Sequence, residues 1–115
     1  MSPLWYSPEL LAGVERQLLE RVQTRWPDSV VSLELRRHKS FIFVSALLTE
    51  KSESEPLLRL RFLGGANRWE LAVYQSSPGA NGGYRSTFLA DGRIGGTAQE
   101  CLDRALELRL PNQLE

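Results

Sequence analysis

The sequence predicts an α+β fold: a five-stranded antiparallel sheet flanked by an N-terminal and a C-terminal helix that pack on one face of it. Helical patterns stand near both ends of the chain, in residues 7–26 and 97–110, where apolar residues recur at helical spacing. Between them, residues 30–89 contain short runs of alternating apolar and polar residues, separated by Gly, Asn and Pro. Strands that follow one another closely in the chain usually pair antiparallel, so we expect one sheet in a single domain spanning residues 1–115.

The first helix begins at a capping signal. The Ser7 hydroxyl can accept a hydrogen bond from a free backbone N–H, Pro8 is tolerated in the first turn, and Glu9 complements the helix dipole. The apolar stripe of this helix consists of Leu11, Val14, Leu18, Val22 and Trp26. Pro27 ends it, because the residue before a proline avoids helical geometry.

Strands account for the middle of the chain. The expected strands are residues 30–37, 41–49, 57–63, 68–75 and 84–89. In the third of them Leu58, Leu60 and Phe62 face one way while Arg59 and Arg61 face the other, as in a sheet with one face packed on the core and the other in solvent. The second strand is apolar on both faces, which predicts a central position in the sheet.

The last helix has the clearest start. Thr97 and Glu100 have the spacing of a capping box, in which each side chain bonds the backbone N–H of the other residue. The apolar residues that follow are Cys101, Leu102, Ala105 and Leu106. Pro111 closes this helix.

Composition narrows the classes of function. The 115 residues include 14 basic and 14 acidic ones, and this zero net charge counts against a nucleic-acid-binding domain, which usually carries a basic excess. Cys101 is the single cysteine and His38 the single histidine, so neither a disulfide nor a four-ligand zinc site is expected, and a reducing, cytoplasmic compartment is indicated. We expect no signal peptide, membrane span, metal or cofactor.

With both helices on one side, the other side of the sheet is predicted to be open. The residues expected on this open face are Glu34, Arg36, Arg59, Arg61, Arg68, Glu70, Tyr74 and Arg85. The second strand should add an outward apolar row made of Ile42, Val44, Ala46 and Leu48. An exposed apolar row needs a cover, which favours a non-enzymatic protein-interaction module that docks a partner protein or a second copy of itself through this row, rimmed by Arg59, Arg61 and Arg68. The alternative is that the chain covers the row itself, with the loop of residues 50–56, with Trp5 or with the aliphatic stems of the arginines. Val44→Glu should then change the oligomeric state or partner capture and leave the circular dichroism spectrum unchanged.

Nucleic acid is the alternative partner, because arginine beside an aromatic ring can contact both bases and phosphates. The residues that would form such a surface are Arg36, Arg37, Lys39, Arg59, Arg61, Arg68, Tyr74 and Arg85. Solvation of a wet sheet face explains the same arginines without any ligand.

The loop before the last helix offers a weaker site. Its residues Arg93, Gly95, Gly96 and Thr97 stand at a helix N-terminus, where backbone N–H groups can hold an anion, although Glu100 brings negative charge to the same place. A small enzyme using these residues, or Cys101 as a nucleophile, is a third possibility, but the sequence shows no convergent acid, base and nucleophile. The spacing of Cys101 favours a packed core cysteine.

Residues 69–110 resemble the double-stranded RNA-binding domain in one respect: strands are followed by a glycine-rich loop and an alanine-containing helix. The resemblance implies RNA binding only if the start of that helix carries the lysine pair of the family. Here the corresponding residues are Ala98, Gln99 and Glu100, so no functional residue carries over.

Overall fold

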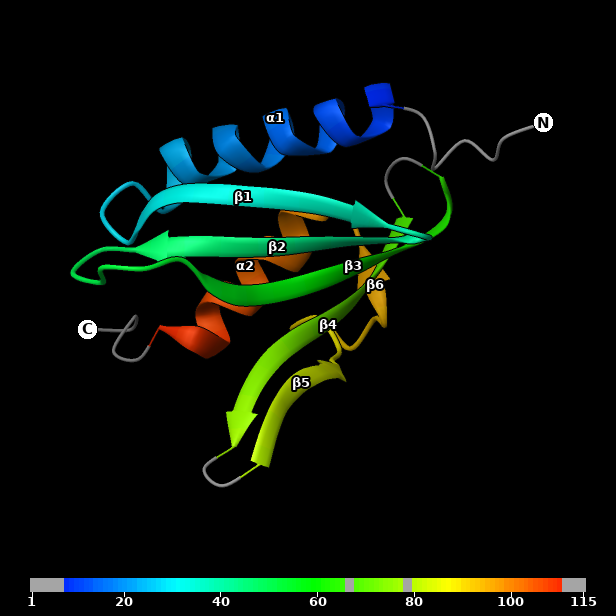
Figure 1. Ribbon diagram of the computed structural model, residues 1–115. Helices are drawn as coiled ribbons and strands as arrows, with labels where there is room; N and C mark the ends of the chain where they lie inside the picture. The colour runs from blue at the N-terminus through cyan, green and yellow to red at the C-terminus, as the bar shows by residue number, and fades with distance from the viewer. Residues whose placement is uncertain (1–7, 66–67, 78–79, 111–115) are drawn as a thin grey trace.

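The computed structural model describes residues 8–65, 68–77 and 80–110. The helices are α1 (Pro8–Arg25) and α2 (Ala98–Arg109), and the strands are β1 (Val30–His38), β2 (Phe41–Leu48), β3 (Glu55–Gly65), β4 (Arg68–Ser77), β5 (Ala80–Ser86) and the two-residue β6 (Gly95–Gly96). Figure 1 shows this order of helix, strands and helix. The predicted α+β class is confirmed, and β6 is an element that the sequence pattern did not indicate.

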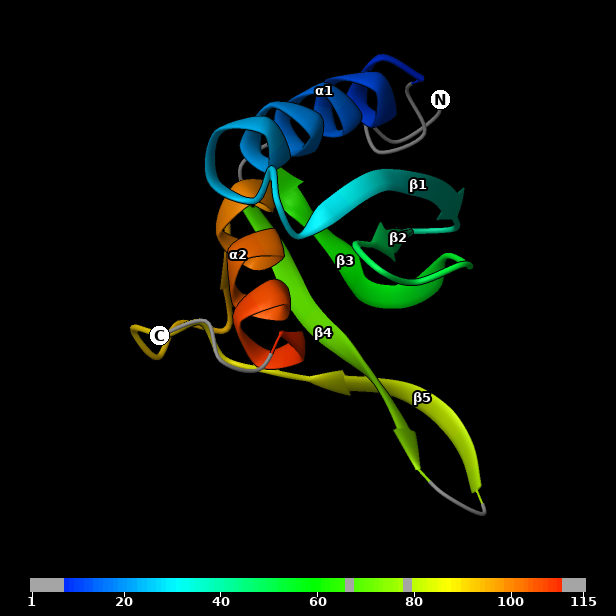
Figure 2. The same cartoon turned by 90° about the vertical axis from the view of Figure 1, so that its left-hand side faces the viewer.

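The sheet is antiparallel throughout, in the order β1-β2-β3-β4-β5, and β6 pairs with β4. The β1–β2 hairpin turns at Lys39 and Ser40, and Lys39 takes a left-handed φ of 56°. The sheet is strongly twisted, and the β4–β5 hairpin extends well beyond α2 (Figure 2).

Helix α1 follows the predicted stripe. Val14, Leu18 and Val22 are buried, and the Trp26 backbone N–H donates to the Val22 carbonyl at 2.9 Å just after the helix ends. The helix stops before Pro27, as expected. The predicted cap, Ser7, lies outside the described residues.

Both helices cover the same face of the sheet, as predicted. They stand on one side of it in Figure 2, and in Figure 1 α2 lies behind the strands. Helix α1 packs against β1, while α2 packs against β3, β4 and α1. Among the largest fully buried side chains of this core are Leu18, Leu58, Leu60, Trp69, Leu71, Leu102 and Leu106.

The predicted orientation of β2 is wrong. Ile42, Val44, Ala46 and Leu48 are all buried, and Val44 is 0% exposed. Their register explains why: Ile42 pairs with Leu60 and Val44 with Leu58, and residues directly opposite each other in an antiparallel pair share a face. The apolar row therefore lies under the helices, and it is not a docking surface.

Strand β6 depends on a close backbone approach. Gly95 pairs with Glu70 and Gly96 with Trp69, in the stretch of β4 that β5 does not reach. A Cβ at Gly95 would lie 1.9 Å from the Trp69 carbonyl oxygen, which is far inside any allowed contact. Glycine is thus required here by space.

Gly95→Ala should therefore destabilise the protein by about 2–3 kcal/mol, because the methyl group meets backbone atoms that cannot rotate away. The urea midpoint measures this loss. Gly83→Ala is the matched control, since nothing lies within 4 Å of a Cβ at that strand glycine. Equal midpoints for both variants would show that β6 can move off β4 without cost.

Candidate functional site

The register assigns most of the predicted residues to the open face, the side of the sheet away from the helices. Arg36 pairs with Phe43, Phe43 with Arg59, and Arg59 with Ala72, which places all of these side chains on one face. The same reasoning places Glu34, Phe41, Arg61, Glu70, Tyr74, Tyr84 and Ser86 there. Arg68 joins them, because its neighbour Trp69 is buried on the other side.

Two residues of the predicted nucleic-acid surface lie on the opposite side. Arg37 pairs with Ile42, and Arg85 pairs with Val73, and both partners are buried under the helices. The placement of Arg85 on the open face is thereby corrected. Tyr84 and Ser86 share the open face, so Arg85 between them faces the other side, where a charged residue was not expected.

The open face carries an aromatic cluster made of Phe41, Phe43, Tyr74 and Tyr84. The ring centroids of Phe41 and Phe43 are 6.1 Å apart, those of Phe43 and Tyr84 5.3 Å, and those of Tyr84 and Tyr74 5.3 Å. The last two pairs meet edge to face, a favoured geometry that is worth about 1 kcal/mol beyond burial.

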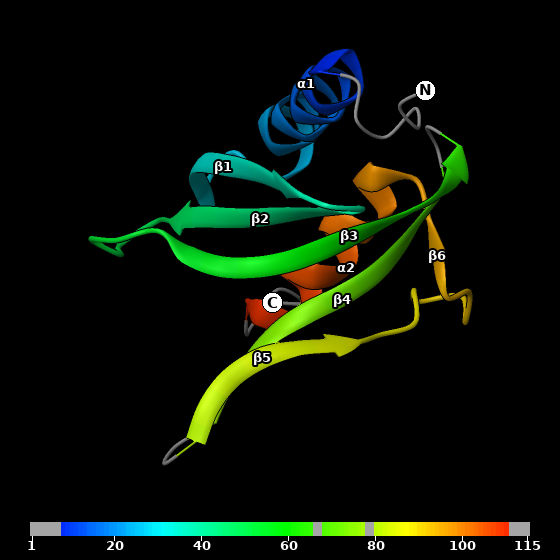
Figure 3. The same ribbon diagram turned by 45° about the vertical axis from the view of Figure 1, so that its right-hand side comes forward.

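This cluster spans the sheet. Phe43 comes from β2 and Tyr84 from β5, so their contact passes over Arg59 of β3 and Ala72 of β4. Ala72 is consequently 2% exposed although no helix covers its face. Figure 3 shows the curvature of β4 and β5 that accompanies this contact. The open face thus has a small packed centre of its own.

Arginines lie on the aromatic rings. The Arg59 guanidinium carbon is 4.5 Å from the Phe41 ring centroid and 5.6 Å from that of Tyr84, and the Arg36 carbon is 5.5 Å from that of Phe43. These are cation–π distances. The Arg59 Nε is buried and makes no hydrogen bond within the described part of the chain.

The positive charge of this face is only partly neutralised. Arg61 lies 3.5 Å from a Glu70 carboxylate oxygen, whereas Arg36, Arg59 and Arg68 form no ion pair with the residues that the structure describes. Burial raises the pKa of the Tyr84 phenol, and the nearby Tyr74 adds to the effect. Tyr84 therefore stays neutral and keeps its O–H donor.

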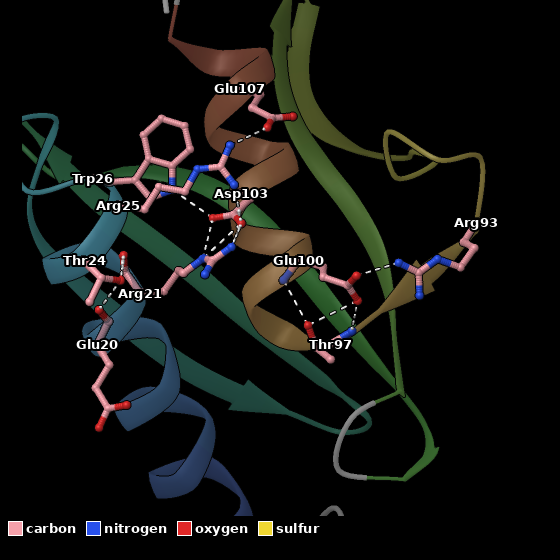
Figure 4. A network of polar contacts seen from close by, with 10 residues as sticks. All are labelled: Glu20, Arg21, Thr24, Arg25, Trp26, Arg93, Thr97, Glu100, Asp103 and Glu107. Atoms are coloured by element: carbon pink, nitrogen blue, oxygen red, sulfur yellow. Dashed lines mark hydrogen bonds and ion pairs between the residues drawn. The ribbon is translucent and has the colours of Figure 1, made fainter.

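The predicted anion site is filled by the chain's own carboxylates. The Arg93 guanidinium donates to Asp91 at 2.7 Å. It also donates to Glu100 at 2.5 Å, and Thr97 and Glu100 form the expected capping box (Figure 4). The pKa of Glu100 is held below its usual value, mainly by the hydrogen bond from the Thr97 backbone N–H and then by the hydrogen bond from the Arg93 side chain. A carboxylate thus already occupies this helix N-terminus.

Cys101 is a core residue, as its spacing favoured. The side chain is 0% exposed, and its Sγ donates a weak hydrogen bond to the Trp69 carbonyl oxygen at 3.8 Å. Burial raises the pKa of the thiol to about 12, so the nucleophilic thiolate is disfavoured at neutral pH.

This burial makes stability depend on pH in a defined window. The pKa of the thiol rises from 9.0 in the unfolded chain to about 12 in the folded one, so the unfolded chain loses its proton first as pH increases. The stability due to the neutral thiol is therefore fully present below pH 9.0 and is lost as pH rises toward 12. When the pH is raised from about 8 to about 10, the free energy of unfolding measured with urea should fall by about 1 kcal/mol more in the wild type than in Cys101→Ala. Equal losses would contradict the buried, protonated thiol.

A buried carboxylate joins the two helices. Asp103 of α2 accepts hydrogen bonds from Arg21 Nη2 at 2.5 Å, from Arg25 Nη1 at 2.9 Å and from the Trp26 indole N–H at 2.9 Å (Figure 4). The hydrogen bond to Asp103 raises the pKa of Arg21. A hollow of about 280 Å³ lies beside this network, and its walls include Arg93, Arg104 and Glu107. Its arginines are all ion-paired, so the network is structural.

Sequence reasoning missed Phe41, Phe43, Tyr84 and Asp103. Phe41 and Phe43 alternate with the row that was predicted to face outward, and a strand that is apolar on both faces does not show which of them faces the core. Asp103 stands at the border of the apolar stripe of α2, where a carboxylate ordinarily faces solvent. Asp103 could have been recognised only together with Arg21 and Arg25, which lie one turn apart on the other helix and donate hydrogen bonds to it.

Comparison with models of protein families, with curated proteins and with solved structures finds no match. No helix in the described ranges is both long and apolar enough to cross a membrane. Those ranges also contain no group of three or more His, Cys, Asp or Glu side chains that could hold a metal ion. The open face is therefore the feature of the described chain that points to a function.

Proposed function

We propose that this protein is a non-enzymatic interaction module that docks another protein through the open face of its sheet. The observation that supports this is the aromatic cluster, whose half-buried rings and flanking arginines form the one face of the described sheet that no helix covers. Tyrosine and arginine are enriched among the residues that dominate binding energy in protein interfaces. Rings that are already packed together also lose little conformational entropy on binding.

The ring geometry favours protein over nucleic acid. A platform for bases presents flat ring faces to solvent. Here Arg59 lies on Phe41 and Tyr84, Arg36 lies on Phe43, and the tyrosine rings meet edge to face. The chain also has no net charge with which to attract a polyanion.

Two adjacent residues of β5 provide a sharp test. Ser86 and Arg85 are both exposed, but Ser86 lies on the open face, where it pairs with Ala72, and Arg85 lies on the opposite side. A photo-reactive benzoylphenylalanine is introduced at either position and irradiated in cells. We expect a discrete protein adduct from position 86 that is absent from position 85 and is lost when Tyr84→Ser is added. An adduct of twice the chain's own mass would identify a second copy as the docked protein.

The proposal fails if position 86 gives no adduct, if both positions give the same adduct, or if the adduct is removed by nuclease. Circular dichroism of each variant is the control for retention of the fold, so that a missing adduct is not mistaken for unfolding.

Single-stranded nucleic acid is the second candidate, because Arg36, Arg59, Arg61 and Tyr74 do share one face. It predicts retention of an oligonucleotide at low salt, weakening steeply toward physiological salt, with loss in Arg36→Ala and no change in Arg85→Ala. Absence of binding at low salt would eliminate it.

A further inference from the structure

Charge is unevenly distributed between the two sides of the sheet. Five arginines near the helices, namely Arg21, Arg25, Arg93, Arg104 and Arg109, have a carboxylate partner, whereas the exposed Arg16 and Arg85 form no ion pair with a described residue. The open face holds four arginines and two glutamates, and only Arg61 has an acidic partner among the described residues. The open face is therefore positively charged, although the chain as a whole has no net charge.

Arginines on the open face lie beside the aromatic cluster or further along the same strands. Arg36 and Arg68 are exposed, and Arg61 has a side chain that is 53% exposed. Arg36 also lies on the Phe43 ring. A guanidinium stacked on a ring keeps its N–H donors in its own plane, directed past the ring, where a carboxylate can accept two of them. The contact with the Phe43 ring favours one position of this donor before the ligand arrives.

An apolar centre with a charged rim is the usual anatomy of a protein interface. We infer that the docked partner is an acidic protein segment, in which apolar or aromatic residues that cover the Phe43–Tyr84 pair are flanked by Asp or Glu that meet Arg36 and Arg68. This inference rests on the proposed function and adds to it the chemistry of the partner. Electrostatic complementarity of this kind sets specificity and the rate of association.

The test selects binding peptides from a random library displayed on phage, with the intact protein as bait. We expect the selected peptides to be enriched in Asp and Glu next to aromatic or aliphatic residues. The variant Arg36→Glu/Arg68→Glu should weaken binding of a selected synthetic peptide by about tenfold or more. Arg16→Glu/Arg85→Glu is the matched control, because it makes the same change in net charge at exposed arginines away from the open face, and it should bind as the wild type does.

Each outcome separates the inference from the proposed function. Selected peptides that lose binding in Tyr84→Ser but show no acidic enrichment, or that tolerate Arg36→Glu/Arg68→Glu, would overturn the acidic partner and leave the docking face intact. Peptides that also tolerate Tyr84→Ser would overturn both, as would a failure to select any binding peptide. If the protein captured an oligo-dT probe and no peptides, and if Arg36→Glu/Arg68→Glu lost this capture, the arginines would serve to bind nucleic acid and the acidic protein segment would be rejected.

Discussion

Val44→Glu should unfold the protein. The valine is 0% exposed, pairs with Leu58 of β3 and belongs to the core beneath the helices. A glutamate there would bury a carboxylate among apolar side chains with no positive group to meet it, and would also lose the packing of the valine. A buried, unpaired charge costs several kcal/mol, which is comparable to the whole stability of a small domain, so we expect a loss of at least about 5 kcal/mol.

Circular dichroism and urea unfolding measure this effect. Val31→Glu is the matched control, because Val31 lies in the neighbouring strand β1 and is 64% exposed. It should change the free energy of unfolding by less than about 0.5 kcal/mol. The sequence pattern alone predicted the opposite result for Val44→Glu, a folded protein with altered association. A native spectrum for this variant would mean that β2 turns its other face to the core.

The order of the elements could be predicted because each depends on local signals. The capping box of Thr97 and Glu100 formed as its spacing indicated, and the alternation of Leu58, Arg59, Leu60 and Arg61 placed the two faces of β3 correctly. In each case polar residues mark the wet side, and the pattern within one segment is sufficient.

The orientation of β2 could not be predicted from β2. Phe41 and Phe43 are as apolar as Ile42 and Val44, so neither row is marked as the wet one, and the pairing with β1 and β3 decides which row meets the helices. The register of β3 contained this information: Val44 is opposite Leu58, whose face was already known. A prediction that carried the face of one strand across to its neighbour would have placed the phenylalanines on the open face.

The site residues that the sequence reveals are likewise those with a local signal. Arg36, Arg59 and Arg61 interrupt apolar runs, so alternation identified them. Tyr84 could be identified only from the contact between β2 and β5. This contact arises from the curvature of the whole sheet, and the sequence of neither strand indicates it. The centre of the candidate site is therefore a tertiary feature, whereas its charged rim is a local one.

Asp103→Ala should cost about 3 kcal/mol, because one carboxylate accepts hydrogen bonds from three side chains of another part of the chain. The side chain of Asp103 is 8% exposed, so its partners lose an acceptor that water replaces poorly. Most of the loss should come from Trp26, because this side chain is 4% exposed and its indole N–H would be left without an acceptor. Arg21 and Arg25 are 36% and 45% exposed and can rehydrate, which keeps the expected loss at the lower end of the range for buried pairs.

Two further variants separate charge from hydrogen bonding. Asp103→Asn keeps an oxygen for the Trp26 N–H and loses the charge, so it should cost about 1–2 kcal/mol. Glu107→Ala removes an exposed carboxylate, 3.1 Å from Arg25, and should cost less than about 1 kcal/mol. Urea midpoints that fall least in Glu107→Ala, more in Asp103→Asn and most in Asp103→Ala, with a shift of the tryptophan fluorescence in Asp103→Ala, would show that the network holds α1 onto α2. If Asp103→Ala and Glu107→Ala instead lost the same amount, the burial of Asp103 would contribute nothing, and the helices would be held by their apolar contacts alone.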